Sequence, residues 1–253
     1  EASGTTITFS AAVSSGDSCY LVYMGSAQQT VTAPAGSIVS SQFSSADLVL
    51  PKTVTIGSAA EEDTKLVFDG NAQDFHVGLD DSADSLTIGL GSTLGTTSHM
   101  VIDATGAITK PLQPAFLVTK SSAQTDTDIN QNVLVAFDTE RFDQNGDFAS
   151  NTFTAPVTGR YQLNTIIYTS DAPNDLAYFT IRLVTSNREY YSIFDPGQAG
   201  LSGANSYHTL NINVLADMDA NDTAYVNFYT PSGTAQTNIE GSHVTSFSGF
   251  LAC

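Results

Sequence analysis

The sequence predicts an all-β protein, and three observations support this fold class. Apolar and polar residues alternate with a period of two in segments along the whole chain, and no window shows a helical period. Glycine, proline, asparagine and serine separate these segments, as they do in turns between strands. Charged residues make up only 13% of the chain, so it has few of the Lys/Glu pairs that stabilise exposed helices.

The predicted strands are short in the first half of the chain and longer in the second. The short ones are Thr6–Phe9, Tyr20–Tyr23, Lys65–Phe68, Phe75–Leu79, Leu86–Leu90 and Met100–Asp103. Beyond Phe116 the alternation continues over longer stretches, for example at Leu210–Val214 and Ala224–Tyr229. Ten of the 14 phenylalanines lie after Pro114. The larger hydrophobic core is therefore expected in the second half.

The chain divides into three predicted segments. Two prolines three residues apart, Pro111 and Pro114, favour an extended connector between the two halves. A weaker break lies between Ala33 and Ser45. We expect a partial small β-module with a linker at residues 1–44, a thin β-rich shaft or repeat region at 45–113, and a C-terminal β-sandwich at 114–253.

The strands of the middle region recur about every ten residues and carry too few large side chains for a private core. Such strands gain most by burying their apolar face against neighbouring copies of the chain. A small independent sandwich is the alternative. The sequence favours the first interpretation, in which contacts between chains stabilise this region.

The chain is strongly acidic, with 26 Asp and Glu against 8 Lys and Arg, and a formal net charge of −18. This charge repels phosphate backbones, so we expect no nucleic-acid partner. It also disfavours anionic membranes, and the apolar runs are far shorter than the roughly 20 residues of a membrane span. A salty environment would screen the self-repulsion.

The chain begins at Glu1 without a methionine or a visible signal peptide, so we expect a processed product or a piece of a longer protein. Its two cysteines, Cys19 and Cys253, lie near opposite ends. Two unpaired thiols are the favoured interpretation, and a disulfide is the alternative. Neither cysteine has the spacing of a metal or redox site.

No catalytic or cofactor motif is present. The four histidines are isolated, and there is no nucleophile elbow, Walker loop or dinucleotide motif. Asp217–Asp222 begins like a calcium loop but lacks the glycine and the final glutamate, so it predicts a turn. Asp126–Asp128 and Asp80–Asp84 could each hold a hard cation at a symmetric interface, although solvated turn carboxylates are commoner. We therefore predict no enzyme, no metal site and no cofactor.

Six pieces of residues 114–253 occur in the order known from one family. They are Pro114–Val118, Asn132–Phe137, the hairpin Phe142–Phe148, the F-x-A-P-x-x-G-x-Y motif at Phe153–Tyr161, the paired strands in Leu210–Phe228, and Phe247–Leu251 with the sequence FSGFL. Together they resemble the complement-type globular head, the jelly roll of the complement q subcomponent and the tumour-necrosis-factor superfamily.

The residues themselves agree with this resemblance. Pro156 fixes φ where one strand ends, and Gly159 is expected to supply the turn before the next. Tyr161, Leu163 and Ile167 should then point to one side, with Gln162 and Asn164 on the other. The resemblance implies a ten-strand jelly roll, a tight homotrimer, ligand binding by surface loops and no catalytic machinery. The Asp-rich 217–222 segment departs from the family, so calcium sites of relatives are not carried across.

The first third resembles a different kind of protein. Ala2–Phe9 followed by Val13–Ser18 is similar to a small β-module of bacteriophage tail fibres, although the strand that normally precedes it is missing. Phe75–Asp103 resembles shaft segments of marine phage fibres. These resemblances imply a virion protein that attaches to other virion proteins through its N-terminal side.

The predicted function is a non-catalytic, trimeric fibre or spike of a bacteriophage virion. Its jelly-roll head would bind a host-surface receptor, expected to be a glycan, through several weak sites at once. Exposed aromatic rings and amides hold sugars by stacking and planar hydrogen bonds. The candidate contacts in predicted loops or loop edges are Tyr190, Tyr191, Asn174, Asn205 and Tyr207.

Three alternatives remain open. A secreted pattern-recognition or adhesion protein of a cell could use the same head, although the chain has no collagen-like G-X-Y stalk. A purely structural protein could decorate a capsid or tail without touching a receptor. A fibre-borne polysaccharide depolymerase is disfavoured, because such enzymes usually have longer β-helical repeats.

Overall fold

The computed structural model describes residues 52–173, 176–196, 206–231 and 236–253, together with positions 2–3, 6–7, 11–12, 14–16 and 18. The chain forms two compact units, Glu1–Thr55 and Ile56–Cys253. In the first unit, β1 (Ala2–Ser3) pairs antiparallel with β2 (Thr6–Ile7). The predicted strand at Tyr20–Tyr23 and the thiol of Cys19 lie outside the described residues.

Every regular element in these ranges is a β-strand, which confirms the predicted all-β fold class. Within the same ranges, no helix is long and apolar enough to cross a membrane.

Residues 64–109 form one antiparallel sheet, here called the middle sheet, in which the strands pair in chain order. Its strands are β3 (Thr64–Phe68), β4 (Phe75–Asp80), β5 (Ser85–Leu90), β6 (Ser98–Ile102) and β7 (Ile108–Thr109). The short strands predicted for this region are confirmed to within two residues. Residues 52–113 build no second sheet, so they do not form the small sandwich that the sequence left as an alternative.

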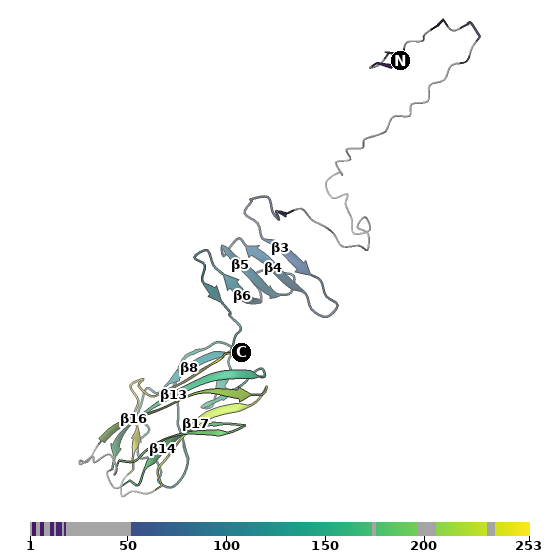
Figure 1. Cartoon of the computed structure of the whole chain (residues 1–253). Helices are drawn as coiled ribbons and strands as arrows, with labels where there is room; N and C mark the ends of the chain where they lie inside the picture. Colours follow the sequence, from purple (N-terminus) through teal and green to yellow (C-terminus); the bar gives the residue numbers. More distant parts are fainter. Residues whose placement is uncertain are drawn as a thin grey trace. The chain divides into compact units, whose positions relative to one another are not determined.

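The C-terminal part, here called the head, is a sandwich of two antiparallel sheets with six strands each (Figure 1). The β13 sheet contains β8 (Ala115–Thr119), β10 (Thr139–Asp143), β13 (Gly159–Ala172), β16 (Ser206–Met218), β18 (Asn238–Ile239) and β19 (Ser246–Leu251). The β14 sheet contains β9 (Val133–Leu134), β11 (Phe148–Ala149), β12 (Thr152–Thr154), β14 (Phe179–Thr185), β15 (Glu189–Phe194) and β17 (Thr223–Tyr229).

The sandwich confirms the predicted architecture, with twelve described strands where the resemblance implied ten. Three of the twelve are only two residues long. The β13 sheet has the order β10-β8-β19-β13-β16, with β18 also paired to β13. The β14 sheet has the order β11-β12-β17-β14-β15, with β9 also paired to β17. The first and the last strand of the head, β8 and β19, therefore pair with each other.

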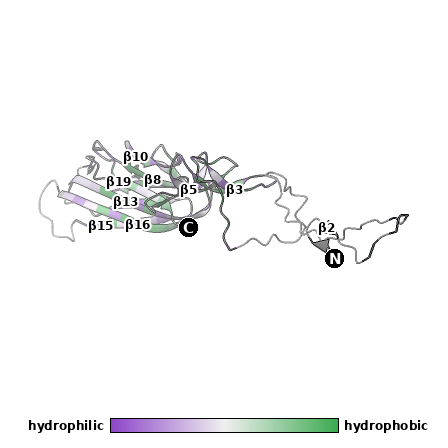
Figure 2. Cartoon of the chain, turned by 90° about the horizontal axis from the view of Figure 1, so that it is seen from above, coloured by the Kyte–Doolittle hydropathy of each residue, from purple (hydrophilic) through white to green (hydrophobic). Residues whose placement is uncertain are grey.

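Alternation along β13 places the core on one side of its sheet. Tyr161, Leu163 and Ile167 are fully buried, whereas Gln162 and Asn164 lie on the opposite side, as the sequence predicted. Bands of hydrophobic and hydrophilic residues follow one another along β13 in Figure 2. The hydroxyl of Tyr161 donates to the carbonyl of Val157, 2.8 Å away, which satisfies its one buried polar atom.

Two aromatic clusters fill the core. In the first, the Phe116 ring lies 4.7 Å from that of Phe153 in the other sheet and 5.0 Å from that of Phe247. In the second, Phe179 lies 6.0 Å from Phe228 and 5.4 Å from Phe194. The first cluster joins the two sheets, because Phe116 and Phe247 belong to the β13 sheet and Phe153 to the β14 sheet. The three rings of the second cluster all belong to the β14 sheet, and they contact the other sheet through His208 of β16, whose ring lies 5.4 Å from that of Phe179.

Two sequence interpretations are wrong. The segment Phe142–Phe148 is not a hairpin, because β10 pairs with β8 and β11 pairs with β12 of the other sheet. The carboxylate of Asp143 instead accepts the N–H groups of Asp147 and Phe148, at 3.0 and 2.8 Å, where the chain crosses between the sheets.

Gly159 does not supply a turn, since it is the first residue of β13 and its φ is not positive. A Cβ at this position would lie 2.8 Å from the carbonyl oxygen of Cys253. Because Gly159 has no side chain, the backbone of Cys253 can lie close to the start of β13.

We expect Gly249→Ala to lower the free energy of unfolding by about 1–3 kcal/mol, the usual effect of overpacking a core. A Cβ on Gly249 would lie 2.6 Å from Cδ2 of Leu163 and 2.8 Å from Cε1 of Phe116. Urea-induced unfolding measures the change. Ser248→Ala, one residue away on the other side of β19, is the control and should stay within about 0.5 kcal/mol. Equal effects of the two substitutions would contradict this packing.

His208 gives the head a predicted pH dependence. Its ring lies 4.6 Å from Phe194 and 5.4 Å from Phe179, and burial lowers the pKa of this imidazole. The unfolded chain then binds more protons, so stability is full above about pH 6.5 and declines as the pH falls through that value. Urea unfolding between about pH 7.5 and 5 should show this decline, and His208→Phe should reduce it. An unchanged decline in the variant would contradict the prediction.

Candidate binding site on the head

The outward face of the β14 sheet has a hollow of about 260 Å³ that we call the arginine–tyrosine hollow. It is lined by Tyr178, Thr180, Arg182, Tyr191, Ile193 and Asp195. Pairing between neighbouring strands brings these residues together: Arg182 of β14 lies opposite Tyr191 of β15, and Thr180 lies opposite Ile193. Most of the wall is therefore formed by two residues of β14, Thr180 and Arg182, and by two residues of β15, Tyr191 and Ile193.

Arg182 lies between two tyrosine rings. The central carbon of its guanidinium is 4.5 Å from the ring centroid of Tyr229 on β17 and 5.2 Å from that of Tyr191 on β15. Cation–π contacts of this kind contribute about 0.5–1 kcal/mol each at exposed sites. Because both neighbouring strands contribute a ring, the flexible arginine side chain is held over the face of the sheet.

The polar atoms of the hollow are incompletely paired. The Nε atom of Arg182 is buried and has no hydrogen-bond partner among the described residues. The Tyr191 hydroxyl donates to Oε2 of Glu189, and this hydrogen bond raises the pKa of Tyr191. Buried donors without partners are uncommon in folded proteins. Arg182 is the cationic side chain among the lining residues of this hollow.

The hollow combines ring faces, an exposed aliphatic side chain and a planar cation. Tyr191 and Ile193 are 52% and 64% exposed, respectively. Such a surface can stack on the apolar face of a sugar ring while the planar group donates hydrogen bonds. Asp195 is the carboxylate among its lining residues, and Glu189 lies next to the hollow through its hydrogen bond with Tyr191. The arrangement fits binding of a ligand.

The five predicted contact residues do not form one site. Tyr191 lines the hollow, but Tyr190, next to it on β15, points to the other side of the sheet and packs against the core. Tyr207 belongs to β16 of the β13 sheet, where it is 65% exposed and its ring lies 5.6 Å from that of Tyr168. Asn174 and Asn205 lie outside the described residues.

Sequence reasoning missed Arg182, Tyr229 and Ile193. One signal was present, because Arg182 is the charged residue in the otherwise uncharged, alternating stretch FTIRLVT of β14. That alternation could have placed Arg182 outside the core. It could not have shown that Tyr229, 47 positions further along the chain, lies beside it.

The outward face of the β13 sheet is a second candidate surface, here called the β13 face. Its exposed apolar residues are Phe142, Ile166, Tyr207, Leu215 and Phe250. Across the strands, Gln162 lies between Leu215 and Phe250, and Asn164 lies between Asn213 and Ser248. Two charged residues that lie opposite each other, Arg160 and Asp217, stand at one end, where Asp217 forms an ion pair with Arg188. Uncharged aliphatic, aromatic and amide groups therefore cover its centre.

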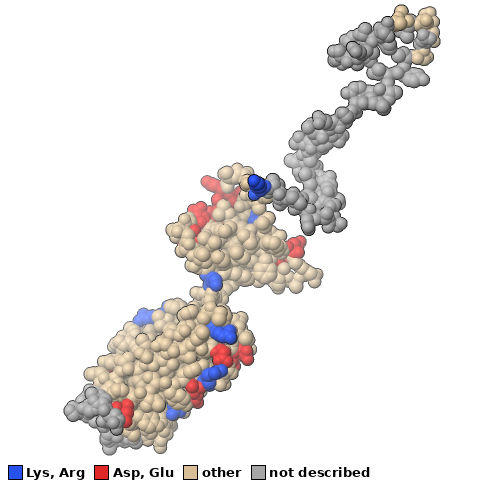
Figure 3. Space-filling model, viewed as in Figure 1, with Lys and Arg blue, Asp and Glu red and all other residues tan. Residues whose placement is uncertain are grey.

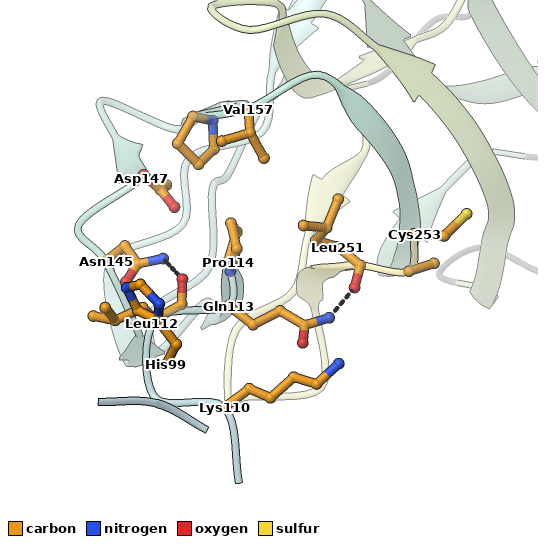
Figure 4. Close-up of a pocket in the computed structure, with 12 residues that line it drawn as sticks. His99, Lys110, Leu112, Gln113, Pro114, Asn145, Asp147, Val157, Leu251 and Cys253 are labelled. Atoms are coloured by element: carbon orange, nitrogen blue, oxygen red, sulfur yellow. Dashed lines mark hydrogen bonds between the residues drawn. The ribbon is translucent and has the colours of Figure 1, made fainter. Parts of the chain in front are cut away.

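A third hollow, of about 720 Å³, lies where the connector joins the head (Figure 4). Lys110, Leu112, Gln113 and Pro114 of the connector line it together with Leu251, Cys253 and residues of two head loops. The side-chain amide of Asn145 donates to the carbonyl of Leu112 at 3.1 Å, and that of Gln113 donates to the carbonyl of Leu251. These bonds fasten the connector to the head.

The titratable groups that line this third hollow are His99, Lys110, Asp147 and Cys253. Burial raises the pKa of Asp147, and the nearby carboxylate of Asp143 raises it further. Cys253 is a free, exposed cysteine. Among the described residues, no group of three His, Cys, Asp or Glu side chains is arranged to hold a metal ion.

The Asp-rich segment is a turn between β16 and β17, as the sequence predicted. The carboxylate of Asp222 accepts the backbone N–H of Asp219 at 2.9 Å and the side-chain amide of Asn187 at 3.0 Å. At the other predicted acidic turn, Oδ1 of Asp80 accepts the hydroxyl of Ser82 at 2.8 Å. These carboxylates cap their own loops.

Comparison with known proteins identifies the head. A family model described as the C1q domain matches residues 115–252. The globular domain of the zebrafish complement 1qA protein is 18% identical, covers 56% of this chain and 98% of its own, and has a TM-score of 0.40. Murine APRIL is 11% identical, covers 55% of this chain and 98% of its own, and has a TM-score of 0.40. No curated protein matches the chain.

The matched segment is more than half of the sequence, and the chain belongs to the C1q domain family. The complement-type resemblance of residues 114–253 is thereby confirmed. Domains of this family are trimeric binding heads in many proteins and are in general not enzymes.

Proposed function

We propose that the chain is a non-catalytic, homotrimeric binding protein whose head recognises a glycan on a cell surface. The observation that carries this proposal is the arginine–tyrosine hollow, in which Arg182 lies between Tyr191 and Tyr229. Family membership supports a binding role and gives no ligand. The chemistry of the hollow supplies the ligand class.

A neutral sugar fits the hollow better than an acidic one. Arg182 contributes one positive charge, while Asp195 lines the hollow and Glu189 is bonded to the Tyr191 hydroxyl. Two carboxylates beside one guanidinium repel an additional anion. A pyranose carries an apolar face that matches Tyr191 and Ile193 and hydroxyls that accept from Arg182.

The β13 face supports the homotrimer. Large exposed patches without charge are rare on monomeric proteins and mark association surfaces. The centre of the β13 face carries Ile166, Leu215 and Phe250 together with amides, and amide pairs such as Gln162 Nε2 to Asn164 Oδ1, at 3.0 Å, satisfy its polar atoms. Uncharged residues also dominate the side of the head visible in Figure 3. For a chain of charge −18, an uncharged face is where identical copies meet with least repulsion.

Trimerisation and glycan binding support each other. A shallow hollow of about 260 Å³ gives weak affinity for one sugar. Three hollows on one assembly turn the second and third contacts into intramolecular ones, which raises the overall affinity by orders of magnitude. The β13 and β14 sheets lie on opposite sides of the sandwich, so assembly through one leaves the other available to ligand.

We place this trimer on a bacteriophage virion, as a fibre or spike that contacts the host. The support is the similarity of residues 2–18 to tail-fibre modules and of Phe75–Asp103 to fibre shafts. Attachment to other virion proteins would then use the N-terminal side. Immunogold labelling of purified virions with antibody against the head tests this location, and labelling confined to the host cell surface would contradict it.

The first prediction concerns assembly. The wild-type chain at micromolar concentration should have about three times the 26.6 kDa mass of one chain. Leu215→Asp should lower the mass to that of one chain, because three carboxylates would be buried close together without partners. Sedimentation equilibrium measures both masses.

The matched control for assembly is Ile193→Asp. Ile193 is 64% exposed and Leu215 53%, but Ile193 lies on the β14 sheet. Its substitution should leave the trimer intact. A wild-type monomer, or a trimer lost through Ile193→Asp and kept in Leu215→Asp, would show that the β13 face is not the interface.

The second prediction concerns the glycan. On an array of bacterial surface polysaccharides, the wild-type trimer should bind a subset of neutral polymers. Tyr191→Ala should weaken that binding at least about tenfold, equivalent to ~1.4 kcal/mol, because it removes a ring that stacks on the sugar and holds Arg182.

Tyr207→Ala is the control for the glycan experiment, since Tyr207 is an equally prominent tyrosine on the opposite sheet. The mass of the Tyr207→Ala variant must first be checked, because Tyr207 belongs to the β13 face proposed as the trimer interface. Binding that survives Tyr191→Ala would contradict the proposed site. If no polysaccharide binds the wild-type trimer, the glycan assignment is wrong while the trimer stands.

A further inference from the structure

We infer that the apolar side of the middle sheet packs against the same side of other copies of this chain. This inference deepens the proposed function, because it rests on the trimer. It adds an interface outside the C1q domain and names the residues that form it.

The polar side of the middle sheet is partly covered by the chain itself. The loop between β5 and β6 covers part of it: the fully buried ring of His76 contacts the carbonyl of Gly91 through Nδ1 at 2.8 Å, and Leu94 is buried. A Cβ on Gly89 would lie 2.4 Å from the carbonyl oxygen of Thr97. The loop therefore lies directly on the backbone of this side at Gly89, whereas Lys65 and Val67 of β3 on the same side are exposed.

The opposite side is apolar and uncovered. Cross-strand pairing aligns Leu79, Leu86 and Ile102 in one row, and Val77, Ile88 and Met100 in the next. Seven of the large apolar side chains on this side are exposed. They are Leu66, Phe68, Phe75, Leu79, Leu86, Ile88 and Ile108.

The middle sheet therefore lacks a core of its own. Of the buried hydrophobic side chains in the described residues, only Leu94 belongs to the part before the head. Burial of a Leu, Ile or Phe side chain contributes about 1.5–3 kcal/mol, and here that contribution is not realised within the unit. A single sheet of this size needs packing on one face to be stable.

Charge selects a copy of this chain as the partner. The strand positions that form the apolar side carry no Asp, Glu, Lys or Arg, although the chain has 26 acidic residues. Any partner surface with carboxylates would have to desolvate them against this side, at a cost of several kcal/mol per ion. The same apolar side of another copy carries none, so copies can bury it against one another without that cost.

The connector makes this contact easy to form. Only residues 110–114 separate β7 from β8, and five residues extend over at most roughly 18 Å. Trimerisation of the heads therefore holds three middle sheets at a high effective concentration, which for short linkers is in the millimolar range. Sheets that would not associate as separate molecules can then close on one another.

Thiol accessibility tests the inference in the full chain. Both native cysteines are replaced (Cys19→Ser and Cys253→Ser), and a single cysteine is introduced by Leu86→Cys or by Leu134→Cys. In one copy these positions are almost equally exposed, at 42% and 40%. Leu134 lies on β9 in the head's β14 sheet and is the matched control. The readout is the rate of reaction with a maleimide, alongside the mass from sedimentation.

In the trimer, the thiol at position 86 should react at least about tenfold more slowly than the thiol at position 134. When Leu215→Asp or dilution reduces the chain to a monomer, the rate at position 86 should rise to that of the control. This pair of results would support packing between copies and exclude coverage by another segment of the same chain.

Each other outcome decides against the inference in a distinguishable way. Rapid reaction at position 86 in an intact trimer would show that the apolar side is open, while the proposed trimer of heads stands. Slow reaction at position 86 in both trimer and monomer would show that the chain covers this side itself. A wild-type chain that is monomeric throughout would overturn the trimer and this interface together.

Discussion

The pairing of β13 with β16 is the interaction on which the head depends. These two long strands are joined from Gly159 opposite Met218 to Ala172 opposite Ser206, although both strands of the β14–β15 hairpin lie between them in the chain. Because side chains alternate, this one register sends Tyr161 and Leu163 into the core and Gln162 to the β13 face. A slip by one residue would exchange the two surfaces. Core packing and the face proposed for assembly are thus set by the same hydrogen bonds.

The two sheets of the sandwich present chemically different outward faces. The β13 sheet presents uncharged aliphatic and amide groups, which suit contact with identical copies of an acidic chain. The β14 sheet presents Arg182 between Tyr191 and Tyr229, which suits a small polar ligand with an apolar face. Neither surface needs a reactive group, in agreement with a family of binding modules. The contact between the rings of Phe116 and Phe153 joins the two sheets.

The two sides of the middle sheet differ in what covers them. Glycines at positions 78 and 89 allow its own loop to lie directly on one side, where His76 is buried and bonded to the backbone. The other side collects leucine, isoleucine and phenylalanine that no described part of the sheet covers. The buried hydrophobic cluster of the chain lies in the head. The apolar side of the middle sheet is the one that we propose packs against other copies.

The sequence by itself determined the fold class, the short strands of the middle sheet, the aromatic core and the complement-type motif, because period-two alternation and turn residues act locally. It also named Tyr191, which lines the arginine–tyrosine hollow, as a candidate contact; its role in binding stays a prediction. Only the tertiary structure decided that Tyr190 packs inward, that Phe142–Phe148 crosses between sheets and that Gly159 makes room for the chain end. It alone placed Arg182 beside Tyr229. The physical reason is that antiparallel pairing joins residues far apart in the chain. The alternation within one strand shows which side chains are buried, but it does not show which other strand lies beside it.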